Sequence, residues 1–247
     1  MPHEFEVSEE ITLDATPEQV WEAIATGPGI DSWFMGHSEI EPRLGGETSH
    51  SMFGEIGHGT VTAYEPLKHF AYKSDESNGE FMAFEYLLEA REGGSTVLRF
   101  VHNGFLGDDW EEQYDALKVG DRKYLEKLAA YVKHFPGRTS AHNMFLPGPK
   151  VADTAKAWAA FTAAFGLTGP VAEGQAAHPQ VGPSTAAGTV THADEEHHTL
   201  IVANPDAVYM LMTGMGMAFA EVHSFNPGID AAAIDAAWQA WLEKSVA

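Results

Sequence analysis

Residues 109–135, DWEEQYDALKVGDRKYLEKLAAYVKHF, form the longest helical pattern of the chain. Asp108 or Asp109 is expected to cap the start of this helix, and Pro136 with Gly137 is expected to end it. At 1.5 Å per residue the helix would be roughly 40 Å long. Its apolar residues recur at spacings of three, four and seven, and therefore share one face: Trp110, Tyr114, Leu117, Tyr124, Leu128, Tyr131 and Phe135.

The stretch before this helix predicts a curved antiparallel sheet. A first strand at residues 5–13 leads into a short helix that Thr16 caps and Pro17 starts. Six further strands follow at short, regular intervals, so each is expected to pair with its neighbour. One long helix cannot fill the concave side of such a sheet, so this α+β arrangement predicts an aromatic-lined cavity. The six strands are predicted at residues 38–44, 48–53, 58–65, 69–74, 81–90 and 95–105.

A boundary is predicted at residues 136–140 (PGRTS), which divides the chain into domains 1–138 and 139–247. The second domain is predicted to repeat the plan of the first in shortened form, although no first strand is obvious. We expect a monomer in which the two domains pack on each other. The predicted elements of the second domain are a helix at 151–165, strands at 189–193, 199–203, 208–213 and 217–224, and a helix at 230–242.

Composition excludes several classes of function. The 247 residues include 14 Lys plus Arg against 36 Asp plus Glu, a net charge of −22, so neither nucleic acid nor an anionic membrane is an expected partner. The absence of cysteine excludes disulfides, thiolate catalysis and Cys-based zinc sites. No apolar run is long enough to span a membrane and no secretion signal is evident, so a cytoplasmic protein is expected.

Six segments of the first domain form an ordered series: ATPEQVWEAI at 15–24, Trp33-Phe34, PRLGG at 42–46, GTVTAYEPLKHFAY at 59–72, STVLRFVHNGF at 95–105 and KYLEKLAAYV at 123–132. This series resembles the START-like, or SRPBCC, superfamily. The resemblance is greatest to the branch that includes the C-terminal domain of the activator of the ninety-kilodalton heat-shock chaperone ATPase. It implies a helix-grip fold with a deep apolar cavity, and the second domain resembles a shortened copy. Relatives in this branch include ligand-binding proteins, polyketide cyclases and proteins that capture enediyne antibiotics.

Few residues offer catalytic chemistry. His102 is expected to face the cavity and can act as an acid or base, but a hydrogen-bonded core histidine is the simpler interpretation. Family members often carry Gly-Trp in the long helix where Gly120-Asp121 stands here, so an acid replaces a large apolar wall. Asp121 could pair with His102, although no spacing rule joins a strand residue to a distant helix residue.

Two further clusters are interpreted as structural. The run THADEEHH at residues 191–198 contains metal-binding side chains, but it falls in a predicted hairpin turn, so no metal site is predicted. Four methionines between 210 and 217 are expected to fill a core, with a promiscuous pocket or a partner surface as the alternative.

The sequence favours a non-catalytic protein that binds or sequesters an apolar, polycyclic small molecule, without a cofactor, a metal or a catalytic residue. Natural-product self-resistance or biosynthesis, with a polyketide or enediyne ligand, is the sharpest form of this hypothesis and follows from the resemblance alone. The alternatives are an aromatase or cyclase-type enzyme and a chaperone-interacting module. The predicted ligand-binding residues are Trp33, Phe34, Phe84, Tyr86, His102, Phe105, Trp110, Tyr114, Leu117, Asp121 and Tyr124.

Overall fold

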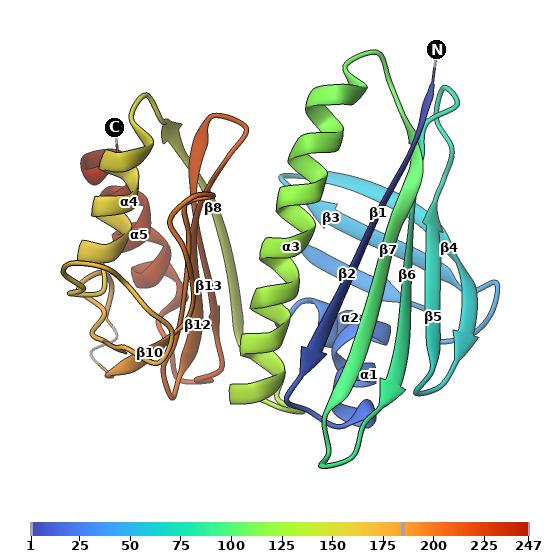
Figure 1. The fold of residues 1–247 in the computed structure, drawn as a ribbon, viewed down its shortest axis with the longest axis horizontal. Helices are drawn as coiled ribbons and strands as arrows, with labels where there is room; N and C mark the ends of the chain where they lie inside the picture. The colour runs from blue at the N-terminus through green and yellow to red at the C-terminus, as the bar shows by residue number, and fades with distance from the viewer. Residues whose placement is uncertain (1, 184–185, 247) are drawn as a thin grey trace. The chain divides into compact units, whose positions relative to one another are not determined.

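The computed structural model describes residues 2–183 and 186–246 of the chain, which forms two compact units, Met1–Thr139 and Ser140–Ala247 (Figure 1). Each unit combines one antiparallel sheet with helices, so the α+β class predicted from the sequence is confirmed. In the described part of the chain, no helix is both long and apolar enough to cross a membrane.

The first unit contains a seven-stranded sheet in the order β1-β7-β6-β5-β4-β3-β2. The strands after β1 form a meander, and the last strand returns to pair with the first, as the register Val7↔His102 illustrates. All six meander strands predicted from the sequence are confirmed with small shifts at their ends. The strands are β1 (His3–Leu13), β2 (His37–Ile40), β3 (Glu47–Met52), β4 (Glu55–Glu65), β5 (His69–Ser74), β6 (Phe81–Ala90) and β7 (Thr96–Leu106).

Three helices complete the first unit. Helix α1 (Pro17–Ala25) begins with a capping box, in which the Thr16 hydroxyl accepts from the Gln19 N–H and the Gln19 side chain accepts from the Thr16 N–H. Helix α2 (Gly27–Ile30) is a single turn. The long helix α3 (Trp110–His134) packs on β1 and α1, and Figure 1 shows it running along the sheet. Asp109 is its N-cap residue but makes no side-chain cap bond, so capping by that carboxylate was wrongly predicted.

The inner face of the first sheet is aromatic because strand alternation and register align large side chains. On β7, Leu98, Phe100 and His102 are buried and share one face. The register places Phe84 opposite His102 and, on its other side, opposite Tyr72 of β5. Three neighbouring strands therefore present rings to the same side of the sheet.

The second unit follows the same order with one strand fewer. Its six-stranded sheet runs β8-β13-β12-β11-β10-β9, and its last strand again pairs with its first. One helix precedes the meander and one follows it, so the second unit is a shortened version of the first. The elements are β8 (His142–Lys150), α4 (Thr154–Ala163), β9 (Ala176–Ala177), β10 (Gly188–Asp194), β11 (Thr199–Ala203), β12 (Ala207–Gly214), β13 (Met217–Ser224) and α5 (Ala231–Ser245).

Strand β8 corrects the expectation that the second domain lacks a first strand. Its sequence contains Pro147 and Pro149, which disfavour a central strand because proline has no N–H to donate. β8 lies at the edge of its sheet, where only one side must pair, so the prolines are tolerated. Helix α4 also begins later than predicted. The Asp153 carboxylate accepts a hydrogen bond from the backbone N–H of Lys156, and this N-cap fixes the start of the helix.

Candidate functional site

A cavity of about 300 Å³ opens on the inner face of the first sheet, against α2 and the segment that follows it. We call it the outer hollow. Its walls combine aliphatic and aromatic surface with serine, threonine and histidine side chains from β2, β3 and β4. The lining residues are Ile30, Phe34, Ser38, Ile40, Thr48, Ser49, His50, Met52, Glu55, Gly57, His58, Tyr72, Ser74 and Phe84.

A smaller hollow of about 40 Å³ lies towards α3, and we call it the inner hollow. It shares Ile30, Phe34, Tyr72 and Phe84 with the outer hollow, so the two are neighbouring compartments that border the same four side chains. The inner hollow is lined by Ile30, Trp33, Phe34, Tyr72, Phe84, Tyr86, Phe100, Asp121, Tyr124 and Leu125.

The walls are fixed by ring packing. Phe34 contacts Tyr124 of α3 edge-on with ring centroids 4.6 Å apart, and Tyr72 stacks on Phe84 at 4.9 Å. The buried Trp33 donates its Nε1–H to the carbonyl oxygen of Ala23 at 2.9 Å, so its polar atom is satisfied within the protein. These flat, rigid rings therefore offer stacking surface to a ligand, and Trp33 adds no unsatisfied polar group to it.

One carboxylate faces the inner hollow. Asp121, on α3, accepts from Nδ1 of His102 on β7, with 3.0 Å to Oδ2 and 3.3 Å to Oδ1. The His102 side chain is 2% exposed and the Asp121 side chain 13%, so the pair is largely desolvated. His102 also stacks on Phe84 with ring centroids 4.3 Å apart. Its Nε2 is buried and has no hydrogen-bond partner among the described residues.

Two tyrosine hydroxyls lie at the same end of the cavity. Burial raises the pKa of Tyr72 and the pKa of Tyr86, and the nearby Asp121 carboxylate raises both further. Both phenols therefore keep their protons at neutral pH and remain hydrogen-bonding groups.

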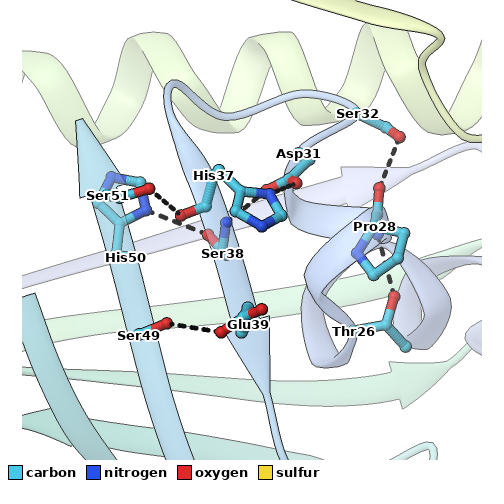
Figure 2. A network of polar contacts seen from close by, with 11 residues as sticks. Thr26, Pro28, Asp31, Ser32, His37, Ser38, Glu39, Ser49, His50 and Ser51 are labelled. Carbon is cyan, nitrogen blue, oxygen red and sulfur yellow. Dashed lines mark hydrogen bonds and ion pairs between the residues drawn. The ribbon is translucent and has the colours of Figure 1, made fainter. Parts of the chain in front are cut away.

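A polar network holds the wall of the outer hollow that is formed by α2, β2 and β3 (Figure 2). The Asp31 carboxylate pairs with Nδ1 of His37 at 2.6 Å and accepts from the backbone N–H of Ser38 at 2.8 Å. The Ser38 hydroxyl in turn lies 3.1 Å from Nδ1 of His50, its direct cross-strand neighbour. Burial lowers the pKa of His50 and outweighs the opposing effect of the Asp31 charge, so the imidazole is neutral at pH 7.

The structure brings together seven of the residues predicted from the sequence. Six line the inner hollow directly, and His102 joins them through Asp121. The pairing of His102 with Asp121, for which the sequence offered no spacing rule, is present. The six are Trp33, Phe34, Phe84, Tyr86, Asp121 and Tyr124.

Four other predicted residues lie elsewhere. Phe105 is on the opposite face of β7 from His102, where its ring packs against Phe81 at 5.5 Å. The remaining three, from the first half of α3, pack with Phe5 and Val7 in a separate apolar cluster. They share the helix face of Tyr124 but lie nearer the start of the helix, away from the cavity: Trp110, Tyr114 and Leu117.

Sequence reasoning missed Tyr72 and the polar residues of the outer hollow. Tyr72 could have been found from the pairing of β5 with β6, because it is the cross-strand neighbour of Phe84. Ser38 and His50 carry no such signal, since neither strand shows a clear alternation of apolar and polar residues.

The two clusters of the second unit are structural elements. Residues 195–198 form the turn between β10 and β11, as predicted, with Asp194 accepting from the N–H of His197. Met210 and Met212 are buried in β12, which fits the core interpretation, whereas Met215 at the β12–β13 turn is 77% exposed.

Residues 14–133 match the family model described as "Activator of Hsp90 ATPase homolog 1-like protein". No curated protein matches the chain. Among solved structures, protein MLL2253 from Mesorhizobium loti is 23% identical, with a TM-score of 0.48 and coverage of 53% of this chain and 98% of that chain. CalU16 from Micromonospora echinospora is 18% identical, with a TM-score of 0.41 and coverage of 53% and 86%.

The Aha1 dimer from Colwellia psychrerythraea is 19% identical, with a TM-score of 0.42 and coverage of 51% of this chain and 95% of that chain. All three TM-scores lie below 0.5, so no inference about a ligand or partner of this chain rests on these structures.

Proposed function

From the match of residues 14–133 to the family model described as "Activator of Hsp90 ATPase homolog 1-like protein", we propose that the first unit binds an apolar, flat small molecule without transforming it. The observation that carries this proposal is the outer hollow of about 300 Å³ with its walls of Phe34, Tyr72 and Phe84. That volume is at the lower end of the range for small-molecule sites. Stacking against these rings would supply the affinity, because aromatic contacts stabilise beyond the area they bury.

The proposal is tested by titrating the full chain with a small polycyclic aromatic probe, naphthalene, and following backbone amide shifts. Saturable shifts at residues of β3, β5 and β6 are expected. Phe84→Ala should weaken binding by about tenfold, since it removes a ring that borders both hollows. The matched control is Phe105→Ala, because Phe105 lies on the other face of the same sheet and its loss should leave affinity unchanged.

A finer form of the proposal is sequestration of a polyketide or enediyne natural product, in self-resistance or biosynthesis. The cavity walls suit a rigid, unsaturated ligand of this kind. Competition against bound naphthalene tests it: a natural product of this class should displace the probe at a lower concentration than an unrelated aromatic dye of similar size. Equal displacement by both would count against the natural-product form and leave the binding proposal intact.

A second candidate is a cyclase-type enzyme that folds a polyketide chain by proton transfer. It is favoured by one observation, the carboxylate of Asp121 at the inner hollow with the buried imidazole of His102 behind it. Product formation from a poly-β-keto thioester, with Asp121→Asn as the comparison, separates enzyme from binder. Turnover that collapses in the variant while binding survives would establish the enzyme, and absence of product with the unmodified protein would dispose of it.

A further inference from the structure

The cavity is divided into compartments of unequal size and unequal chemistry. The outer hollow, at about 300 Å³, accommodates rings, whereas the inner hollow, at about 40 Å³, has room for little more than one water-sized group. The four side chains common to both place the compartments next to each other. A ligand that fills both must therefore have a ring system with one small substituent at its buried end.

The charge of the inner hollow selects that substituent. Asp121 is the only carboxylate among the residues that line it, and no lysine or arginine lies among them. Within the described residues its hydrogen-bond partner is His102, so a carboxylate with about four acceptor sites has some left for a ligand. A hydrogen-bond acceptor on the ligand would face the lone pairs of Asp121 with no proton between them. An anionic group would be repelled by the charge of the carboxylate.

The pairing with His102 keeps the carboxylate in place as an acceptor. Nδ1 faces the Asp121 carboxylate at 3.0 Å, whereas Nε2 is buried without a hydrogen-bond partner among the described residues. The imidazole is fixed between the rings of Phe84 and Phe5, so Asp121 cannot turn away without breaking a largely buried contact. The long-range field of a chain with a net charge of −22 acts in the same direction, against anionic ligands.

We infer that the ligand of this cavity, if the proposed binding function is correct, is an aromatic molecule whose buried end carries a hydrogen-bond donor, a hydroxyl or an amine, held by Asp121. Tyr72 adjoins the same space and keeps its phenolic proton, so it serves a hydroxyl substituent as a second partner. A carboxylate at that end is selected against, because the negative charge of Asp121 repels it.

Four probes with the same ring system test this inference on the full chain: naphthalene, 2-naphthol, 2-(aminomethyl)naphthalene and 2-naphthoate. The naphthol and the amine are expected to bind at least about tenfold more tightly than naphthalene, as a charge-assisted hydrogen bond provides. The naphthoate is expected to bind most weakly. Tighter binding of the amine than of the naphthol would show that the negative charge of Asp121 contributes most, and the reverse order would show that Tyr72 acts together with Asp121.

Asp121→Asn keeps the shape and one acceptor oxygen, so the amine should fall to the affinity of naphthalene while the naphthol loses only part of its advantage. Asp115→Asn is the matched control, since it makes the same chemical change at an exposed position of the same helix, outside the lining of both hollows, and should leave the order of the probes unaltered. Equal binding of all four probes, or tightest binding of the naphthoate, would overturn the inference while leaving the binding function standing. Absence of binding by every probe would overturn both.

Discussion

The two units share a topology but differ in the side chains of their last strand. In the first unit β7 presents the large residues Leu98, Phe100 and His102 to the inner face of the sheet. In the second unit β13, which occupies the same place between the first strand and the meander, presents residues of its core that are much smaller. These are Ala218, Ala220 and Val222.

The terminal helices α5 and α3 pack differently on the two sheets. Small side chains on β13 allow α5 to lie directly on β8 and β13. The packing is tight, because a Cβ at Gly148 of β8 would lie only 3.1 Å from a methyl carbon of Leu242 on α5. Trp238, 1% exposed, then fills the space between this helix and the sheet. In the first unit α3 likewise packs against the edge strand, β1, but the rings of the central strands border the two hollows.

The same topology therefore carries large aromatic side chains beside hollows in the first unit and a packed core under α5 in the second. The second unit also has a depression of about 400 Å³. Its lining combines loop residues such as Asp206, Asn226 and Gly228 with Tyr209, Val222 and Ile234 of the core. The binding site that we propose lies in the first unit, where aromatic rings border the hollow.

The largest expected effect concerns the filled core. Trp238→Ala should destabilise the second unit by about 3–5 kcal/mol, because a fully buried indole leaves a cavity that the surroundings cannot close. Phe34→Ala should cost the first unit only about 1–2 kcal/mol, since this ring is half-buried beside space that already exists. Urea unfolding followed through amide signals of each unit measures both, and equal losses would contradict the distinction between core and cavity.

A smaller effect is expected from making the second unit resemble the first. Ala220→Phe places a ring on β13 where α5 and the sheet are in contact, so it should destabilise the second unit by about 1–3 kcal/mol through overpacking. The control is Ala232→Phe on the exposed side of α5, which should change stability by no more than about 0.5 kcal/mol. A tolerated Ala220→Phe would show that side-chain size on this strand does not set the position of the helix.

The sequence predicted most of this architecture because both determinants of the first unit are local. The helical period of residues 110–134 and the alternation along β6 and β7 require no knowledge of distant contacts. Strand β8 escaped prediction for the opposite reason: its prolines indicate a linker until its place at a sheet edge is known.

The site was predicted less completely than the fold. Phe84 and Tyr86 of β6 and His102 of β7 were assigned to the correct face, whereas Phe105 of β7 was not. For α3, a helix face does not reveal how far along its length a cavity extends. Tyr124 therefore lines the inner hollow, whereas Trp110 and Tyr114 on the same stripe pack against Phe5 and Val7. Asp121 and His102 are 19 residues apart, and only the crossing of α3 over the sheet brings them together.

Gly120 offers a test of how loosely α3 is held. A Cβ built at this position meets no atom within 4 Å, and glycine within a helix costs about 0.5–1 kcal/mol relative to alanine. Gly120→Ala should therefore stabilise the first unit by about that amount. Gly148→Ala in β8 should give no gain, because its Cβ would lie 3.1 Å from the Ala218 oxygen and from Leu242. Thermal unfolding of the two variants measures the contrast, and stabilisation by both would mean that the second core is as open as the first.

The smallest expected effect is a pH dependence of stability, and it comes from His50, a titratable side chain in the wall of the outer hollow. Burial lowers the pKa of His50 in the folded protein, so the unfolded chain takes up this proton first as the pH falls. The contribution of His50 is therefore complete above its unfolded pKa, about 6.5, and is lost as the pH falls towards the lower folded value.

His50→Gln should accordingly reduce the loss of thermal stability between pH 7.5 and pH 5.5, since glutamine can still bond to the Ser38 hydroxyl but does not titrate. His134, whose pKa burial also lowers, remains in both proteins and sets a common background. Parallel pH profiles for the two proteins would exclude His50 as a source of acid sensitivity. A flatter profile for the variant would show that the imidazole at the cavity wall lowers the stability of the first unit in acid. A wholly apolar core would carry no such dependence.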